Sequence, residues 1–157
     1  MVNKIKNHDF LVVGSGASGA AISWRLGKAG FNVICLEQGP QVNSDSYPHT
    51  KPDWEFLAQH EWNINPNKRS LPQDYPINDQ NSEISPLMFN AVGGSTIHWT
   101  AHAPRFHPSD FRVKSLDGVA DDWPISYEDL ELYYDLNDEI MGCSGINGDP
   151  ANPIRKK

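Results

Sequence analysis

Hydrophobic residues near the start of the chain form two short apolar runs, at 9–13 and at 32–36. Runs of this length that end at glycine-rich or acidic positions predict β-strands. Between them, from 17 to about 29, apolar residues recur at the i, i+4, i+7 spacing of one helix face. The order predicts a strand–helix–strand unit over 9–39, and therefore an α/β, Rossmann-like fold.

The following segment, residues 40–85, is polar and rich in proline and asparagine. Proline removes a backbone donor and interrupts regular elements, so this composition predicts an extended loop. A loop of this length inside a compact domain is commonly functional. A second glycine turn follows, within the segment 90–106.

A helix is predicted over residues 126–141. Ser126 is a suitable N-cap, two acidic residues in the first turn favour the helix dipole, and Gly142 is a suitable end. Apolar and aromatic residues at helical spacing predict a face buried against the core. These residues are Leu130, Tyr133, Tyr134, Ile140 and Met141.

The chain has 157 residues and a formal net charge of −7, which disfavours a broad nucleic-acid surface. No apolar run approaches the roughly 20 residues of a membrane-spanning helix, and the polar start shows no leader, so a cytoplasmic location is expected. Cys35 and Cys143 are too few for a disulfide framework or a metal knuckle. Cys35 lies in an apolar stretch and is expected to be buried.

The string Gly-Ser-Gly-Ala-Ser-Gly at 14–19 joins the first strand to the helix. Glycines at this junction permit a tight turn, close approach of a pyrophosphate and close packing of helix on strand. Backbone N–H groups at the helix start, aided by the helix dipole, bind phosphates. Glu37, at the end of the second strand, can accept hydrogen bonds from a ribose diol. The candidate cofactor-binding residues are Gly14, Gly16, Ala17, Ser18, Gly19, Glu37 and Gln38.

A second motif, Asn-Ala-Val-Gly-Gly-Ser-Thr-Ile-His-Trp at 90–99, would bring backbone N–H groups and hydroxyls to a polar cofactor edge. Together with the first turn and the run at 122–130, it resembles the flavin loop of the glucose-methanol-choline (GMC) oxidoreductases. The resemblance implies an FAD-binding domain of the GMC type that oxidises a CH–OH group of an alcohol or sugar by hydride transfer to flavin. Five residues also stand where two-dinucleotide flavoproteins place them, which favours FAD over NAD. They are Leu26, Gly30, Val33, Glu37 and Gly39.

His98 followed by Trp99, with Pro-Arg-Phe at 104–106, is closest in form to pyranose 2-oxidase and related sugar dehydrogenases. That resemblance implies covalent attachment of the flavin 8α carbon to His98 and a contact of Thr100 near flavin N5. A non-covalent polar contact or a core position for His98 stays open. His98, His102 and His107 do not predict a metal site, because Pro104 interrupts the helix that their spacing would need. The candidate cofactor-binding residues of this motif are Gly93, Gly94, Ser95, His98 and Thr100.

The family's catalytic base is a histidine in its C-terminal part, and nothing here resembles that region. We therefore expect no catalytic residue in this chain, an incomplete FAD-binding domain over 1–157, and an absent C-terminal substrate domain. The expected partner is a small alcohol or sugar, with the electron acceptor open. Two alternatives remain: an NAD-dependent dehydrogenase, and a truncated, non-catalytic nucleotide-binding remnant.

Overall fold

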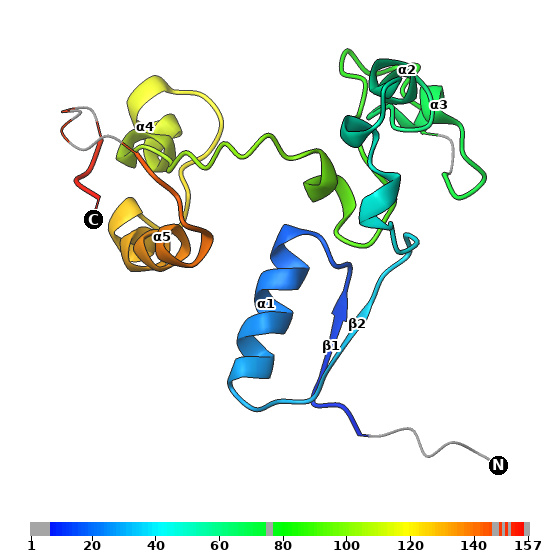
Figure 1. The fold of residues 1–157 in the computed structure, drawn as a ribbon. Helices are drawn as coiled ribbons and strands as arrows, with labels where there is room; N and C mark the ends of the chain where they lie inside the picture. The colour runs from blue at the N-terminus through cyan, green and yellow to red at the C-terminus, as the bar shows by residue number, and fades with distance from the viewer. Residues whose placement is uncertain (1–6, 75–76, 146–147, 149, 151, 156–157) are drawn as a thin grey trace. The chain divides into compact units, whose positions relative to one another are not determined.

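The computed structural model describes residues 7–74, 77–145, 148, 150 and 152–155. The chain divides into two units, Met1–Thr100 and Ala101–Lys157, each with elements of its own (Figure 1). The division falls inside the segment 90–106: the motif at 90–99 lies wholly in the first unit, whereas the Pro-Arg-Phe run at 104–106 lies in the second.

The first unit begins with two parallel strands, β1 (Phe10–Val13) and β2 (Val33–Leu36), joined through helix α1 (Ala17–Lys28). A parallel pair requires a crossover connection, and α1 supplies it alongside the strands (Figure 1). The elements expected over 9–39 are therefore present, and the Rossmann-like α/β class is confirmed. Cys35 is exposed, contrary to expectation, because a two-stranded sheet with one helix leaves most of β2 uncovered.

The proline-rich segment 40–85 is more regular than the sequence predicted. It contains two 3-10 turns, η1 (Ser44–Ser46) and η2 (Pro48–Thr50), and two short helices, α2 (Trp54–Gln59) and α3 (Pro66–Arg69). Proline is tolerated in the first turn of a helix, where its missing N–H has no intrahelical partner. Pro48 and Pro66 occupy such positions, so here proline begins elements as well as interrupting them.

The second unit contains the 3-10 turn η4 (Pro108–Arg112) and helices α4 (Val113–Asp117) and α5 (Tyr127–Met141). Ser126 caps α5: its hydroxyl accepts a hydrogen bond from the Asp129 N–H, and the Asp129 carboxylate accepts one from the Ser126 N–H. Gly142 ends the helix with a φ of 68°. The predicted helix and both of its end signals are confirmed.

The expected core face of α5 is wrong for three of its members. Tyr133, Ile140 and Met141 are 64%, 54% and 47% exposed. The buried aromatic residue of α5 is Tyr127, at its first turn, where it stacks on the ring of Tyr134. Among the described residues, no helix has the length and apolar character needed to cross a membrane.

Candidate dinucleotide-binding site

The first glycine turn has the geometry that the motif predicts. Gly14 has a φ of +87°, a left-handed conformation that side chains disfavour. A Cβ at Gly19 would lie 1.9 Å from the Gly14 carbonyl oxygen, so α1 approaches the turn too closely for any side chain there. A Cβ at Gly16 would meet nothing within 4 Å. Gly19 is therefore required by packing, while the space at Gly16 stays open towards a ligand.

The start of α1 presents backbone donors that have no acceptor within the helix. Its ladder begins with the hydrogen bond from Ala20 N to Gly16 O, and no side chain caps Gly16. The N–H groups of residues 17–19 come before this ladder and have no intrahelical acceptor. These N–H groups, with the positive end of the helix dipole, are suited to an anion such as a pyrophosphate.

Glu37 is already engaged by the protein. Its Oε2 accepts hydrogen bonds from Ser15 N (2.8 Å) and Ser15 Oγ (2.6 Å), and its Oε1 accepts one from Gly39 N (2.9 Å). The hydrogen bond from Gly39 N, followed by those from Ser15, lowers the pKa of Glu37 to about 2. The carboxylate is therefore ionised at neutral pH, and Oε1 retains capacity for a further donor such as a ribose hydroxyl.

The second glycine turn lies directly against the first. Gly93 N donates to Ser15 Oγ at 2.9 Å, and Val92 N donates to the Pro40 carbonyl at 3.0 Å. A Cβ at Gly39 would lie 2.2 Å from Ala91 N, so the two backbones are in direct contact. Segments far apart in the sequence are thus in direct contact.

After this turn comes the 3-10 helix η3 (Gly94–His98), which carries three of the predicted residues. Gly94 has a φ of 57°, and Ser95 Oγ accepts a hydrogen bond from Phe89 N at 3.3 Å. Thr100 is exposed and belongs to the same unit, as do the exposed Ala17, Ser18 and Gln38.

His98 lies in an aromatic cluster. Its ring is 4.8 Å from that of Phe89 and 6.5 Å from that of Trp62, both edge to face. Its Nε2 is buried and has no hydrogen-bond partner among the described residues. Burial, and secondarily the positive charge of Arg69, lowers the pKa of His98, so its imidazole is neutral at pH 7. A cavity of about 350 Å³ opens beside it, lined partly by Trp54.

Ser15 and Arg69 are functional candidates that the sequence analysis missed. Ser15 stands between two glycines of the motif, where a side chain that contacts both Glu37 and Gly93 could have been suspected. Arg69 had no comparable signal, because its contacts depend on the folding of the 40–85 segment. Among the described residues, no group of three or more His, Cys, Asp or Glu side chains could hold a metal ion.

The first comparison concerns the class of fold. The NAD(P)-binding Rossmann-like domain family matches residues 12–70, which include the first glycine turn and Glu37. This match agrees with the β1–α1–β2 unit, so the fold class is Rossmann-like α/β with a short parallel sheet.

Three proteins to which this chain is similar are oxidoreductases by name. The chain is 46% identical over 157 residues to 2-methyl-1,2-propanediol dehydrogenase of Mycolicibacterium austroafricanum. This alignment covers 99% of this chain and 28% of that protein. It is 27% identical to the fructose dehydrogenase large subunit of Gluconobacter japonicus, covering 98% of this chain and 30% of that protein. It is also 27% identical to the gluconate 2-dehydrogenase flavoprotein of Pantoea cypripedii, in an alignment that covers 92% of this chain and 27% of that protein. The chain thus spans less than a third of the length of each relative.

Proposed function

We propose that this chain is the FAD-binding part of a GMC-type oxidoreductase that oxidises a CH–OH group of a small alcohol or sugar. The contact of the second glycine turn with the first carries the proposal, because a single dinucleotide cradle needs no such second turn. The relatives support it, since their names describe dehydrogenases of a diol and a sugar and, in one case, a flavoprotein.

The residues of the first unit fit an FAD. The open space at Gly16 and the N–H groups of residues 17–19, which precede the helix ladder, suit the pyrophosphate, and Oε1 of Glu37 suits a ribose hydroxyl. The second turn supplies polar groups at Gly93, Gly94 and Ser95 for the flavin end. When bound, FAD supplies the hydride acceptor of the reaction. We place the acid–base residues that act on the substrate in parts of the protein outside this chain.

His98 is the proposed flavin contact in this unit. Its buried, unpaired Nε2 is a strong candidate because such an atom costs free energy unless a ligand engages it. Its lowered pKa keeps the imidazole neutral, and a neutral imidazole can serve either as a hydrogen-bond acceptor or as a nucleophile. The GMC resemblance favours a covalent bond to the flavin 8α carbon, and the unpaired Nε2 is compatible with either state.

The experiment compares glycine variants in the full-length protein. Gly16→Val should abolish FAD incorporation with little effect on far-UV circular dichroism, because its side chain enters open space meant for phosphates. Gly27→Val is the matched control: Gly27 also has nothing within 4 Å of its Cβ position but lies away from the turn. Full flavin content in Gly16→Val would overturn the cradle assignment. A wild-type protein that binds NAD and carries no flavin would favour the NAD-dependent alternative.

Acid precipitation then separates the two states of His98. Flavin retained in the pellet, and found on the His98 peptide by mass spectrometry, supports the covalent bond. Flavin released to the supernatant shows a non-covalent contact and weakens the resemblance to the sugar-oxidising subgroup. In either case His98→Ala should leave FAD bound, because Gly16 and Glu37 still hold the other end of the cofactor.

A further inference from the structure

Ser15 hydrogen-bonds to both Glu37 and Gly93, whose segments also meet where Gly39 packs on Ala91 and where Val92 N donates to the Pro40 carbonyl. Its Oγ lies 2.6 Å from Glu37 Oε2 and 2.9 Å from Gly93 N. Glu37 ends the first predicted motif, and Gly93 begins the turn of the second. One hydroxyl therefore lies between an ionised carboxylate and the backbone of a distant loop.

The direction of these hydrogen bonds follows from chemistry alone. A backbone N–H can only donate, and an ionised carboxylate can only accept. The Ser15 hydroxyl must therefore accept from Gly93 and donate to Glu37. Hydrogen bonds in such a series polarise one another, and a charged acceptor at the end strengthens the whole series.

We propose that Ser15 is a positioning residue that transmits the charge of Glu37 to the second glycine turn. Glu37 then has two tasks: binding ribose through Oε1, which rests on the proposed function, and holding the second turn through Oε2 and Ser15. The first turn thus keeps the flavin-side loop in place by an electrostatic relay, in addition to the packing of Gly39 on Ala91.

The test measures hydrogen exchange in full-length protein without added nucleotide, in peptides that span 90–96. Ser15→Ala should speed exchange at the Gly93 amide by about 2- to 12-fold, the effect of losing one net hydrogen bond. Ser15→Thr keeps the hydroxyl and should restore protection. Ser44→Ala, at an exposed serine of η1, is the matched control and should leave the peptide unchanged. Unchanged exchange in Ser15→Ala would overturn the proposal.

Glu37→Ala tests the relay, because Glu37 reaches Gly93 through Ser15. It should also speed exchange at Gly93, and this effect should disappear when Ser15→Ala is already present. Glu37 has a second route to the loop through its hydrogen bond from Gly39 N, which packs on Ala91. An effect of Glu37→Ala that persists in the Ser15→Ala background would assign the coupling to that route and overturn the role of Ser15.

Flavin binding separates this inference from the proposed function. If the wild-type protein takes up FAD, Ser15→Ala should retain most of it but change the visible circular dichroism of the flavin, since the adjoining loop has shifted. An unchanged flavin spectrum in Ser15→Ala would count against a positioning role. If the wild-type protein binds no FAD, the proposed function fails, while the exchange results still decide whether the relay exists.

Discussion

In the part of the chain that the structure describes, each unit contains one buried arginine, and the two arginines form different sets of contacts. Arg69, 6% exposed, forms a bidentate ion pair with Asp74, through Nε at 2.8 Å and Nη2 at 2.6 Å. Its Nη1 donates to the backbone carbonyls of Asn63 and Met88. Its guanidinium also lies over the ring of Phe89 at 4.5 Å. Arg69 thus connects several parts of one irregular segment.

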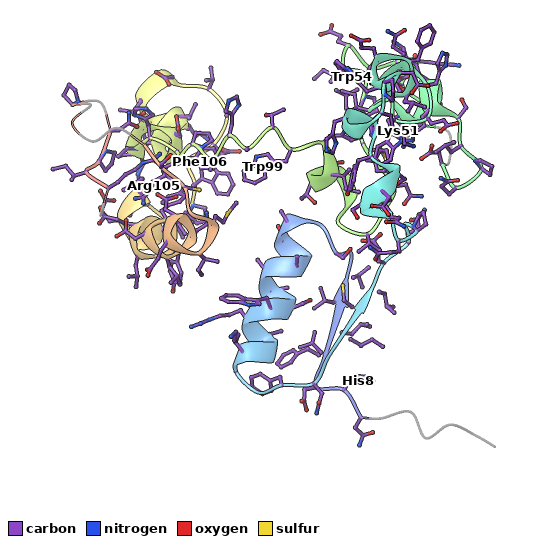
Figure 2. All side chains as sticks on the ribbon, viewed as in Figure 1. His8, Lys51, Trp54, Trp99, Arg105 and Phe106 are labelled. Carbon is purple, nitrogen blue, oxygen red and sulfur yellow. The ribbon has the colours of Figure 1, made fainter. Side chains whose placement is uncertain are left out.

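Arg105, 8% exposed, is held by side chains of a single regular helix. It donates to Asp138 at 2.6 and 3.0 Å, to Asp135 at 2.9 Å and to the Tyr127 hydroxyl at 3.3 Å. The two acids are three residues apart on α5 and therefore share a face. Figure 2 shows Arg105 beside this helix. Arg105, the arginine of the Pro-Arg-Phe run, thus attaches an irregular segment of the chain to α5.

The difference shows how charge substitutes for regular structure. In the 40–85 segment the backbone forms few regular hydrogen bonds, so Arg69 donates to backbone carbonyls as well as to an acid. In the second unit α5 satisfies its own backbone, so Arg105 needs only side-chain acceptors. Because Phe89 packs on His98, the Arg69 cluster also adjoins the candidate site.

Replacing either arginine should cause the largest losses of stability. Each loss should be confined to the unit that contains the replaced arginine. Arg69→Met leaves the Asp74 carboxylate, only 4% exposed, without its ion-pair partner. Arg105→Met removes the cation that Asp135 and Asp138 share, although Asp138 keeps Arg155 at 3.7 Å. Loss of one partner from a buried pair costs about 3–5 kcal/mol. Hydrogen exchange should quicken in peptides of 60–90 for Arg69→Met and of 105–141 for Arg105→Met. Equal effects in both sets of peptides would contradict the separation of the two clusters.

Single removal of an acid should distinguish the clusters further. Asp74→Asn removes the negative charge but keeps an acceptor oxygen, and Arg69 still donates to the carbonyls of Asn63 and Met88. We therefore expect a smaller loss in the unfolding free energy than for Arg69→Met, about 1.5–3 kcal/mol. Asp135→Asn leaves Asp138 to neutralise Arg105, so the loss should be about 1 kcal/mol. Denaturant titration of both variants measures this. A larger loss in Asp135→Asn would show that Arg105 needs both acids.

His98 should make the stability of the first unit depend on pH. This effect should be smaller than the losses caused by replacing the arginines. Its pKa is lowered from 6.5 in the fold, so the unfolded chain binds a proton first as the pH falls. Stability is therefore full above pH 6.5 and decreases below it. His98→Gln should remove part of this decrease, whereas the control His60→Gln, at an exposed position, should not. Unfolding free energies measured above and below pH 6.5 test this prediction. The same pH dependence in His98→Gln as in the wild-type protein would refute it.

The smallest effect is expected at an exposed ion pair. Lys114 Nζ lies 2.9 Å from Asp121 Oδ1, but the two side chains are 62% and 87% exposed. Water screens such pairs, so Lys114→Ala should change the unfolding free energy by less than about 0.5 kcal/mol. A loss comparable to that of Asp74→Asn would show that burial does not explain the importance of the two arginines.

Element boundaries were predictable where they depend on neighbouring residues. Ser126 and Gly142 mark the ends of α5 because capping involves atoms within one turn of the helix. The short elements of 40–85 were missed because proline was interpreted only as an interruption. The predicted burial was wrong for Cys35 and for three residues of the α5 face, because burial depends on which other elements cover a face.

The sequence by itself determined the parts of the site that local geometry dictates: a strand, a glycine turn at Gly14, a helix start and an acid at Glu37. Only the tertiary structure showed that Ser15 connects Glu37 to Gly93, that Arg69 holds the segment beside His98, and that His98 Nε2 is left unpaired. The reason is physical. Glycine and capping preferences act over a few bonds, whereas hydrogen bonds and burial between residues tens of positions apart depend on the folded path of the whole chain.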